Sequence, residues 1–194
     1  MKLNRKNYIY QNSAKPLLRG VSFLLFLPFF IYKCFYNTHL FSNILIINTL
    51  VLAVIYHLIE FKNVKFELMF WKLDFIGILC GIFSFVFLFN DNYFSKSFIF
   101  NFSILISLSF MVYKNFNKRY IYCIISVIYA FLYLLVFNSS VIVKSVYLFA
   151  IGVIAIFFYI IQRYYKIENE YISFHEIFHL LVIIIICYKL HLFS

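Results

Sequence analysis

Residues 40–61 read LFSNILIINTLVLAVIYHLIEF, an apolar stretch that carries no Asp, Glu, Lys or Arg before Glu60. Roughly twenty such residues suffice for a helix to cross a bilayer. Six further runs of mostly apolar residues have a similar length and lie at about 17–36, 69–90, 97–113, 119–138, 141–162 and 172–193. Short polar connections separate them. The sequence therefore predicts an all-α membrane protein, a bundle of seven transmembrane helices forming a single domain over residues 17–194.

The composition agrees with a chain dissolved in lipid rather than in water. Apolar residues make up 65% of the sequence and charged residues 12%, whereas a soluble domain carries about 25% charged residues. The net charge of +10 gives no reason to expect a nucleic-acid partner, because its placement has a simpler explanation in membrane topology. We therefore expect an integral, multi-pass membrane protein whose main partner is the lipid bilayer.

The lysines and arginines predict the orientation, since cytosolic loops of membrane proteins are enriched in them. If residues 1–16 form a cytosolic tail, 13 of the 17 Lys and Arg residues fall on the cytosolic side of the seven runs. The other four lie on the opposite side: Lys33, Lys96, Lys144 and Lys189. The sequence thus predicts a cytosolic N-terminus and a C-terminus across the membrane.

Four ionisable residues are expected to lie in the cytosolic leaflet although they are far apart in the sequence. They are His57 near the end of the second run, Asp74 near the start of the third, and His175 and His179 at the start of the seventh. Ionisable groups within membrane helices are costly, so each is a candidate functional residue. Taken singly, His57 could be an interfacial residue and Asp74 a solvated boundary residue.

Together these residues suggest a metal site. His175 and His179 are four apart and lie on one helix face, and His57 would supply a third imidazole. Three protein ligands with one open position are the usual plan of a catalytic zinc site. Asp74 could hold a water molecule by hydrogen bond and take its proton, since zinc lowers the pKa of bound water to about 7. We therefore predict Zn²⁺ as the cofactor.

The same segment contains HEIFH, residues 175–179, which matches the HExxH signature of zinc metalloproteases. Such enzymes need a further ligand downstream, and the nearest candidate, His191, lies about 18 Å along the helix from His179. Asp74 lies before the motif rather than after it. An intramembrane protease is therefore the least favoured function.

Several strings resemble the hemolysin III proteins, a family similar to the adiponectin and progestin receptors and to alkaline ceramidases. These are KPLLRG (15–20), Tyr56-His57, KLDFIGIL (72–79), IGVIAIFFY (151–159) and FHEIFHLLV (174–182). The resemblance implies zinc ligation by His57, His175 and His179, with Asp74 as the catalytic, water-holding carboxylate. It also implies a zinc-dependent hydrolase acting on a lipid amide or ester.

The chain departs from the family pattern at three places. Ala53 stands where the family usually has Ser, Phe75 where it often has His, and FSFVFLF (83–89) where it has Gly-Thr-Tyr-Thr-Pro. Ala53 removes a hydroxyl that could position water or substrate. A non-catalytic, receptor-like bundle with structural zinc therefore stays open as an alternative, and a pore-forming cytolysin ranks below it.

Overall fold

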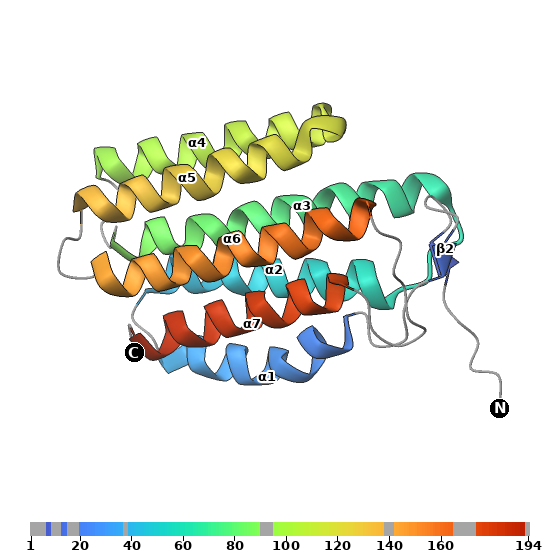
Figure 1. The fold of residues 1–194 in the computed structure, drawn as a ribbon, viewed down its shortest axis with the longest axis horizontal. Coiled ribbons are helices and arrows are strands. Elements are labelled where there is room, and N and C mark those ends of the chain that lie inside the picture. Colours follow the sequence, from blue (N-terminus) through green and yellow to red (C-terminus); the bar gives the residue numbers. More distant parts are fainter. Residues whose placement is uncertain are drawn as a thin grey trace.

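The computed structural model describes residues 7–8, 13–14, 20–36, 39–89, 95–137, 142–164 and 174–192. Over these ranges the fold is helical, with one short strand pair in the predicted N-terminal tail, β1 (Asn7–Tyr8) against β2 (Ser13–Ala14) (Figure 1). The helices are α1 (Val21–Tyr36), α2 (Leu40–Leu58), α3 (Val64–Val86), α4 (Lys96–Lys114), α5 (Arg119–Phe137), α6 (Ile142–Tyr164) and α7 (Phe174–Leu192). Each predicted run therefore contains a helix, and the predicted all-α class is confirmed.

Four stretches in the described ranges are long and apolar enough to cross a membrane. They are Leu40–Leu58, Val64–Val86, Lys96–Lys114 and Phe116–Val136. Shorter apolar segments occur in α1 (Val21–Tyr32) and α7 (Ile177–Tyr188). The predicted membrane character is thus supported by helix length and composition.

Helix α3 begins at Val64, earlier than the predicted start near residue 69. The cause is local, because the side chain of Asn63 accepts a hydrogen bond of 2.8 Å from the backbone N–H of Lys65. Asn is among the preferred residues for capping a helix N-terminus in this way. The earlier start places Asp74 near the middle of α3 instead of one to two turns from its beginning.

Helix α4 forms despite its polar residues because their side chains bond within the protein. Ser103 and Ser107 donate to the carbonyls of Ile99 and Ser103, each at 2.8 Å. Bonds of this kind back to the preceding turn are the usual way that Ser is accommodated within a helix. The serines within this apolar run therefore cost the helix little.

Two apolar cores flank α2. One gathers around α3, α4 and α5 and includes Phe83, Phe87 and Leu108. The other joins α1, α2 and α7 through Phe30, Leu50 and Ile186, among others. Figure 1 shows the helices side by side, with α4 and α5 along one edge of the bundle and α1 and α7 along the other. Helix α2 contributes to both cores, and its most extensive contact is with α3.

The contact between α2 and α3 depends on two small residues one turn apart, Gly77 and Gly81. A Cβ atom built at Gly77 would lie 3.4 Å from Thr49 Cα, and one at Gly81 would lie 3.2 Å from Thr49 Oγ1. Thr49 Oγ1 lies 2.7 Å from the carbonyl oxygen of Gly77, to which it donates. Small residues spaced by four let membrane helices approach closely and bond across the interface. This contact fixes the register of the two helices.

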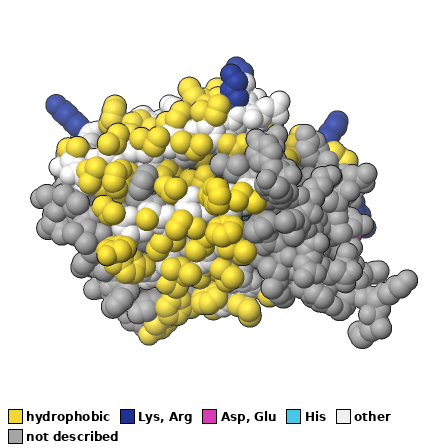
Figure 2. Space-filling model, viewed as in Figure 1, with side chains coloured by type: hydrophobic (Ala, Val, Ile, Leu, Met, Phe, Trp, Pro, Cys, Tyr) yellow, Lys and Arg dark blue, Asp and Glu magenta, His cyan; other side chains and the backbone are white. Residues whose placement is uncertain are grey.

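The outer faces of α4 and α5 expose large apolar side chains, as expected of helices surrounded by lipid. Phe100, Phe110, Ile128 and Val136 are each between 48% and 73% exposed. Figure 2 shows hydrophobic side chains across the middle of this view and Lys and Arg side chains at its margins. Large apolar side chains exposed together on neighbouring helices mark a protein that contacts a membrane or another apolar partner.

The close approach of α2 and α3 predicts that two glycines will respond differently to the same change. Gly152→Ala is expected to keep or raise stability, because a Cβ atom there meets none of the described residues within 4 Å and Ala gains up to about 1 kcal/mol of helix propensity. Gly81→Ala is expected to be less stable than Gly152→Ala by about 1–3 kcal/mol, because the new methyl group overpacks against Thr49. Unfolding by SDS in mixed micelles measures both free energies. Equal stabilisation of the two variants would contradict tight packing at Gly81.

Candidate functional site

Three of the four residues predicted for the site meet in the fold. His57 lies in the last turn of α2, Asp74 in the middle of α3 and His179 near the start of α7. His57 Nε2 lies 3.8 Å from Asp74 Oδ2, and the ring centroids of His57 and His179 are 4.7 Å apart. The three residues are 3%, 7% and 2% exposed, respectively. Helices distant in the sequence thus place two imidazoles and one carboxylate together in the interior.

The fourth predicted residue, His175, belongs to α7 and precedes His179 by about one turn, but its side chain lies outside the described residues. So do the side chains of Glu176 and His191. Among the side chains that the structure does describe, no group of three or more His, Cys, Asp or Glu residues has an arrangement suited to a metal ion. The placement of the predicted third imidazole therefore stays a prediction.

His57 Nε2 and Asp74 Oδ2 lie close together without a direct hydrogen bond between these two atoms. A separation of 3.8 Å exceeds the length of a normal N–H···O bond, which is about 2.9 Å. Burying ionisable groups costs free energy unless they are paired or coordinate a metal. Burying three of them together is therefore hard to explain by packing alone and marks this position as a candidate functional site.

Aromatic rings hold both imidazoles in place. Phe23 of α1 packs on His179 with ring centroids 4.4 Å apart, and Tyr56 lies against His57 at 4.8 Å. Phe23 and Tyr56 are each 3% exposed. Because the neighbouring rings are themselves buried, rotation of the imidazoles is restricted. A metal or catalytic site needs imidazole nitrogens that point in fixed directions, and restricted ring rotation provides this.

The backbone just before α1 packs directly against His57. Gly20 has φ +80°, a conformation that favours glycine because other L-residues meet a steric penalty there. A Cβ atom at Gly20 would also lie 2.8 Å from His57 Cβ. The end of the KPLLRG string therefore contacts a site residue directly.

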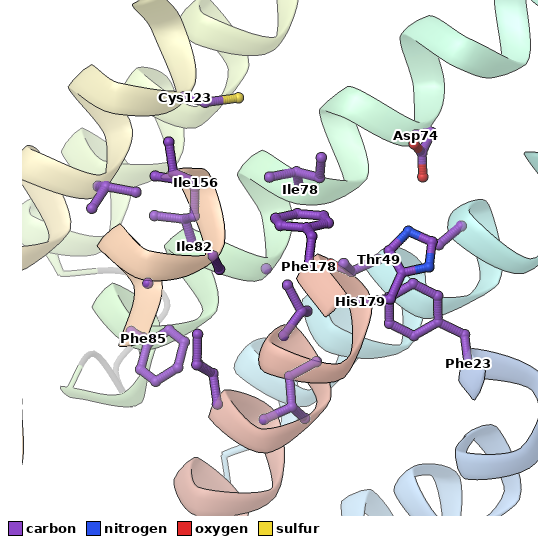
Figure 3. Close-up of a pocket in the computed structure, with 18 residues that line it drawn as sticks. Phe23, Thr49, Asp74, Ile78, Ile82, Phe85, Cys123, Ile156, Phe178 and His179 are labelled. Atoms are coloured by element: carbon purple, nitrogen blue, oxygen red, sulfur yellow. The ribbon is translucent and has the colours of Figure 1, made fainter. Parts of the chain in front are cut away.

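A cavity of about 120 Å³ leads away from the site between α2, α3, α5, α6 and α7. Its polar lining residues are few, and two of them, Asp74 and His179, lie at one end in Figure 3. The opposite part is walled by apolar side chains such as Ile82, Phe85 and Ile156 (Figure 3). The cavity thus offers an apolar space that ends at a carboxylate and an imidazole.

The positions that depart from the resembled family lie in different surroundings. Ala53 is buried, one turn before His57, and lines the cavity. Phe75 does not line it. Its ring packs against Phe116 and Tyr120 on the far side of α3, with centroids 5.4 and 5.9 Å apart. Ala53 and Phe85, which belongs to the third departure, FSFVFLF, therefore change the surface that a molecule in the cavity would touch, and Phe75 does not.

Sequence reasoning missed Arg119, which is 7% exposed at the start of α5. Its guanidinium carbon lies 4.4–5.2 Å from the ring centroids of four aromatic residues, Trp71, Phe75, Phe116 and Tyr120. Such cation–π contacts stabilise a desolvated arginine. The signal available in the sequence was an arginine at the predicted start of a helix, with aromatic residues next to it. Arg119 thereby ties α5 to α3.

Comparison with protein-family models, with curated proteins and with solved structures found no match.

The position of Gly20 predicts that adding a side chain there will disturb the site. Gly20→Ala is expected to lower the free energy of unfolding by at least about 1–2 kcal/mol, the cost of the left-handed backbone conformation alone. Gly20→Asn separates the two causes, because Asn tolerates positive φ better than Ala does. If the contact with His57 dominates, both variants will be destabilised similarly in SDS unfolding. A wild-type stability for Gly20→Ala would show that His57 does not depend on this close approach.

Proposed function

We propose that the protein crosses the membrane seven times, with its N-terminus in the cytosol and its C-terminus on the opposite side. The distribution of Lys and Arg supports this orientation, since 13 of the 17 fall on one side. Seven α-helices in the described ranges, four of them clearly long and apolar enough to span a bilayer, support the number. In this orientation the His57, Asp74 and His179 cluster lies toward the cytosolic leaflet.

We further propose that His57, His175 and His179 hold a zinc ion. The donor set fits, because two buried imidazoles from different helices have ring centroids 4.7 Å apart. The third, His175, precedes His179 by one turn on the same helix face. Imidazole nitrogen suits a borderline ion such as zinc, whereas magnesium and calcium prefer oxygen ligands. A nearby carboxylate also reduces the net charge that the apolar surroundings must accommodate.

The reaction that this site supports best is hydrolysis of an amide or ester in a lipid. A zinc ion held there supplies Lewis-acid chemistry, polarising a carbonyl group and making water a better nucleophile near neutral pH. Asp74 would accept the proton of the attacking water as general base. It would then return that proton to the departing amine or alcohol as the C–N or C–O bond breaks. Asp74 lines the same cavity as His179, so this role requires no rearrangement of helices.

The cavity supports a lipid as substrate. Its walls are apolar over most of their length, and its polar groups gather at the end where the chemistry would occur (Figure 3). A short part of a hydrocarbon chain can lie along such walls, in a cavity of about 120 Å³, while the adjoining amide or ester group lies beside Asp74 and His179. The observation that carries the proposal is this juxtaposition of an apolar cavity with three buried ionisable residues.

One observation favours a second, non-catalytic function. Ala53 lines the cavity one turn from His57 and offers only a methyl group there. Without a hydroxyl at this point, zinc could serve to fasten α2 to α7 in a receptor-like bundle. The two functions predict the same metal content and differ in turnover.

Metal content tests the zinc site. The wild-type protein purified in detergent is expected to contain about one zinc per chain, and His57→Ala is expected to lose it because a ligand from α2 is missing. His39→Ala is the matched control, since His39 is at the other end of the same helix. Elemental analysis measures all three proteins. Zinc retained in His57→Ala would exclude the three-histidine site and favour binding by the HEIFH segment alone.

Turnover separates the two proposed functions. Asp74→Asn is expected to keep its zinc but to hydrolyse a fluorescent ceramide or acyl ester about 10²–10⁴-fold more slowly than wild type, because the general base is gone. Lys114→Ala, at the C-terminal end of α4 and outside the cavity lining, is the control for expression and folding. If wild-type protein contains zinc and cleaves no amide or ester of a broad lipid panel, the structural function of zinc is favoured.

A further inference from the structure

A second hollow lies between α4 and α5, away from the histidine site. It measures about 660 Å³ and opens toward the outer surface of the bundle. Its lining comes from the beginning of α4 and from the second half of α5. Because α3 and α4 follow one another as antiparallel neighbours, this groove lies near the end of the bundle at which α3 finishes. The histidine site is nearer the other end.

One end of the groove is polar and its hydroxyl groups are held in place. Ser97 Oγ and Tyr133 Oη are 3.0 Å apart and share a hydrogen bond. Tyr129 donates to the side-chain carbonyl of Asn101, which is fully buried, and Asn101 Nδ2 lies 3.5 Å from Ser97 Oγ. Lys96 is exposed beside these groups. Of the seven described residues that line the groove, Lys96 alone is charged.

The rest of the groove is apolar and faces outward. Phe100, Leu132 and Val136 line it and are 62%, 53% and 73% exposed. Side chains this exposed on a membrane-crossing helix contact hydrocarbon. The groove therefore presents a strip suited to an acyl chain next to a cation and a set of hydroxyl groups.

The length of α4 places this polar end at the level of lipid headgroups. Helix α4 has 19 residues and is about 28 Å long at 1.5 Å per residue, close to the hydrocarbon thickness of about 30 Å. Its two ends carry Lys96 and Lys114, so each lysine lies near one headgroup layer. Only Lys96 adjoins the groove; Lys114 Nζ instead lies 5.8 Å from the ring centroid of Phe110.

We propose that this groove binds a bilayer phospholipid with an anionic headgroup. The Lys96 ammonium group pairs with the phosphate, and the hydroxyls of Ser97 and Tyr133 lie within the same polar end to bond its oxygens. One acyl chain follows Phe100 and Leu132 into the bilayer, whereas Val136 lies at the level of Lys96, one turn beyond Tyr133 on α5. The lipid belongs to the leaflet opposite the histidine site. Lipid binding here requires only that α4 and α5 lie in a membrane, and it is independent of zinc and of hydrolysis.

Native mass spectrometry of the full-length, delipidated protein in detergent tests this site. The protein is titrated with phosphatidylglycerol and with phosphatidylcholine of the same acyl chains. Wild type is expected to bind phosphatidylglycerol about fivefold more tightly, the effect of one lysine near a membrane surface. Lys96→Ala is expected to lose this preference, and Lys96→Arg to keep it because the charge remains.

Lys114→Ala is the matched control, since it removes the same charge from the other end of the same helix and should keep the wild-type preference. Glycerol 3-phosphate added in excess should not displace the bound lipid, because it lacks the acyl chain. Three results would overturn the proposal: a preference unchanged in Lys96→Ala, an equal loss in Lys114→Ala, or displacement by glycerol 3-phosphate alone. The first two would show that Lys96 does not determine the preference for the anionic headgroup. The third would show that the groove binds a phosphate group without needing a lipid.

Discussion

The close approach of α2 and α3 is the constraint on which the rest of the site depends. Thr49 packs over Gly77 and Gly81 and donates a hydrogen bond to the Gly77 carbonyl. His57 lies about two turns beyond Thr49 on α2, and Asp74 lies about one turn before Gly77 on the antiparallel α3. Fixing the register at the glycines therefore brings an imidazole and a carboxylate to the same level. A larger residue at Gly81 would push the two helices apart.

The second half of the site comes from α1 and α7, which pack together on the other side of α2. Phe23 connects them, because it belongs to the apolar core shared by α1, α2 and α7 and also packs on His179. In an apolar medium there is little hydrophobic drive to hold helices together, so close packing and internal polar contacts decide their arrangement. The site and the bundle are thus stabilised by the same contacts, with Gly20 and Phe23 supporting one imidazole each.

Much of the helical architecture could be predicted from hydropathy, and the differences have local causes. Helix α3 starts at Val64 because the side chain of Asn63 caps it, a signal present in the sequence but hidden in a polar connection. Helix α4 survives its serines because they bond to carbonyls in the preceding turn. The buried Arg119 could not be predicted, because its aromatic neighbours come from α3, α5 and the turn between α4 and α5 and meet only in the folded chain.

The sequence by itself determined the helices, their apolar faces and the residue types available to a site, because these follow from local composition and from the spacing of side chains along one helix. It also placed His57 and His179 at matching depths through the alternation of helix directions. Only the tertiary structure decided that these two rings lie 4.7 Å apart and next to Asp74, that Ala53 lines the cavity and that Phe75 does not. These facts depend on the rotation and separation of helices far apart in the sequence, which the glycine contacts and aromatic packing set and which no single segment specifies.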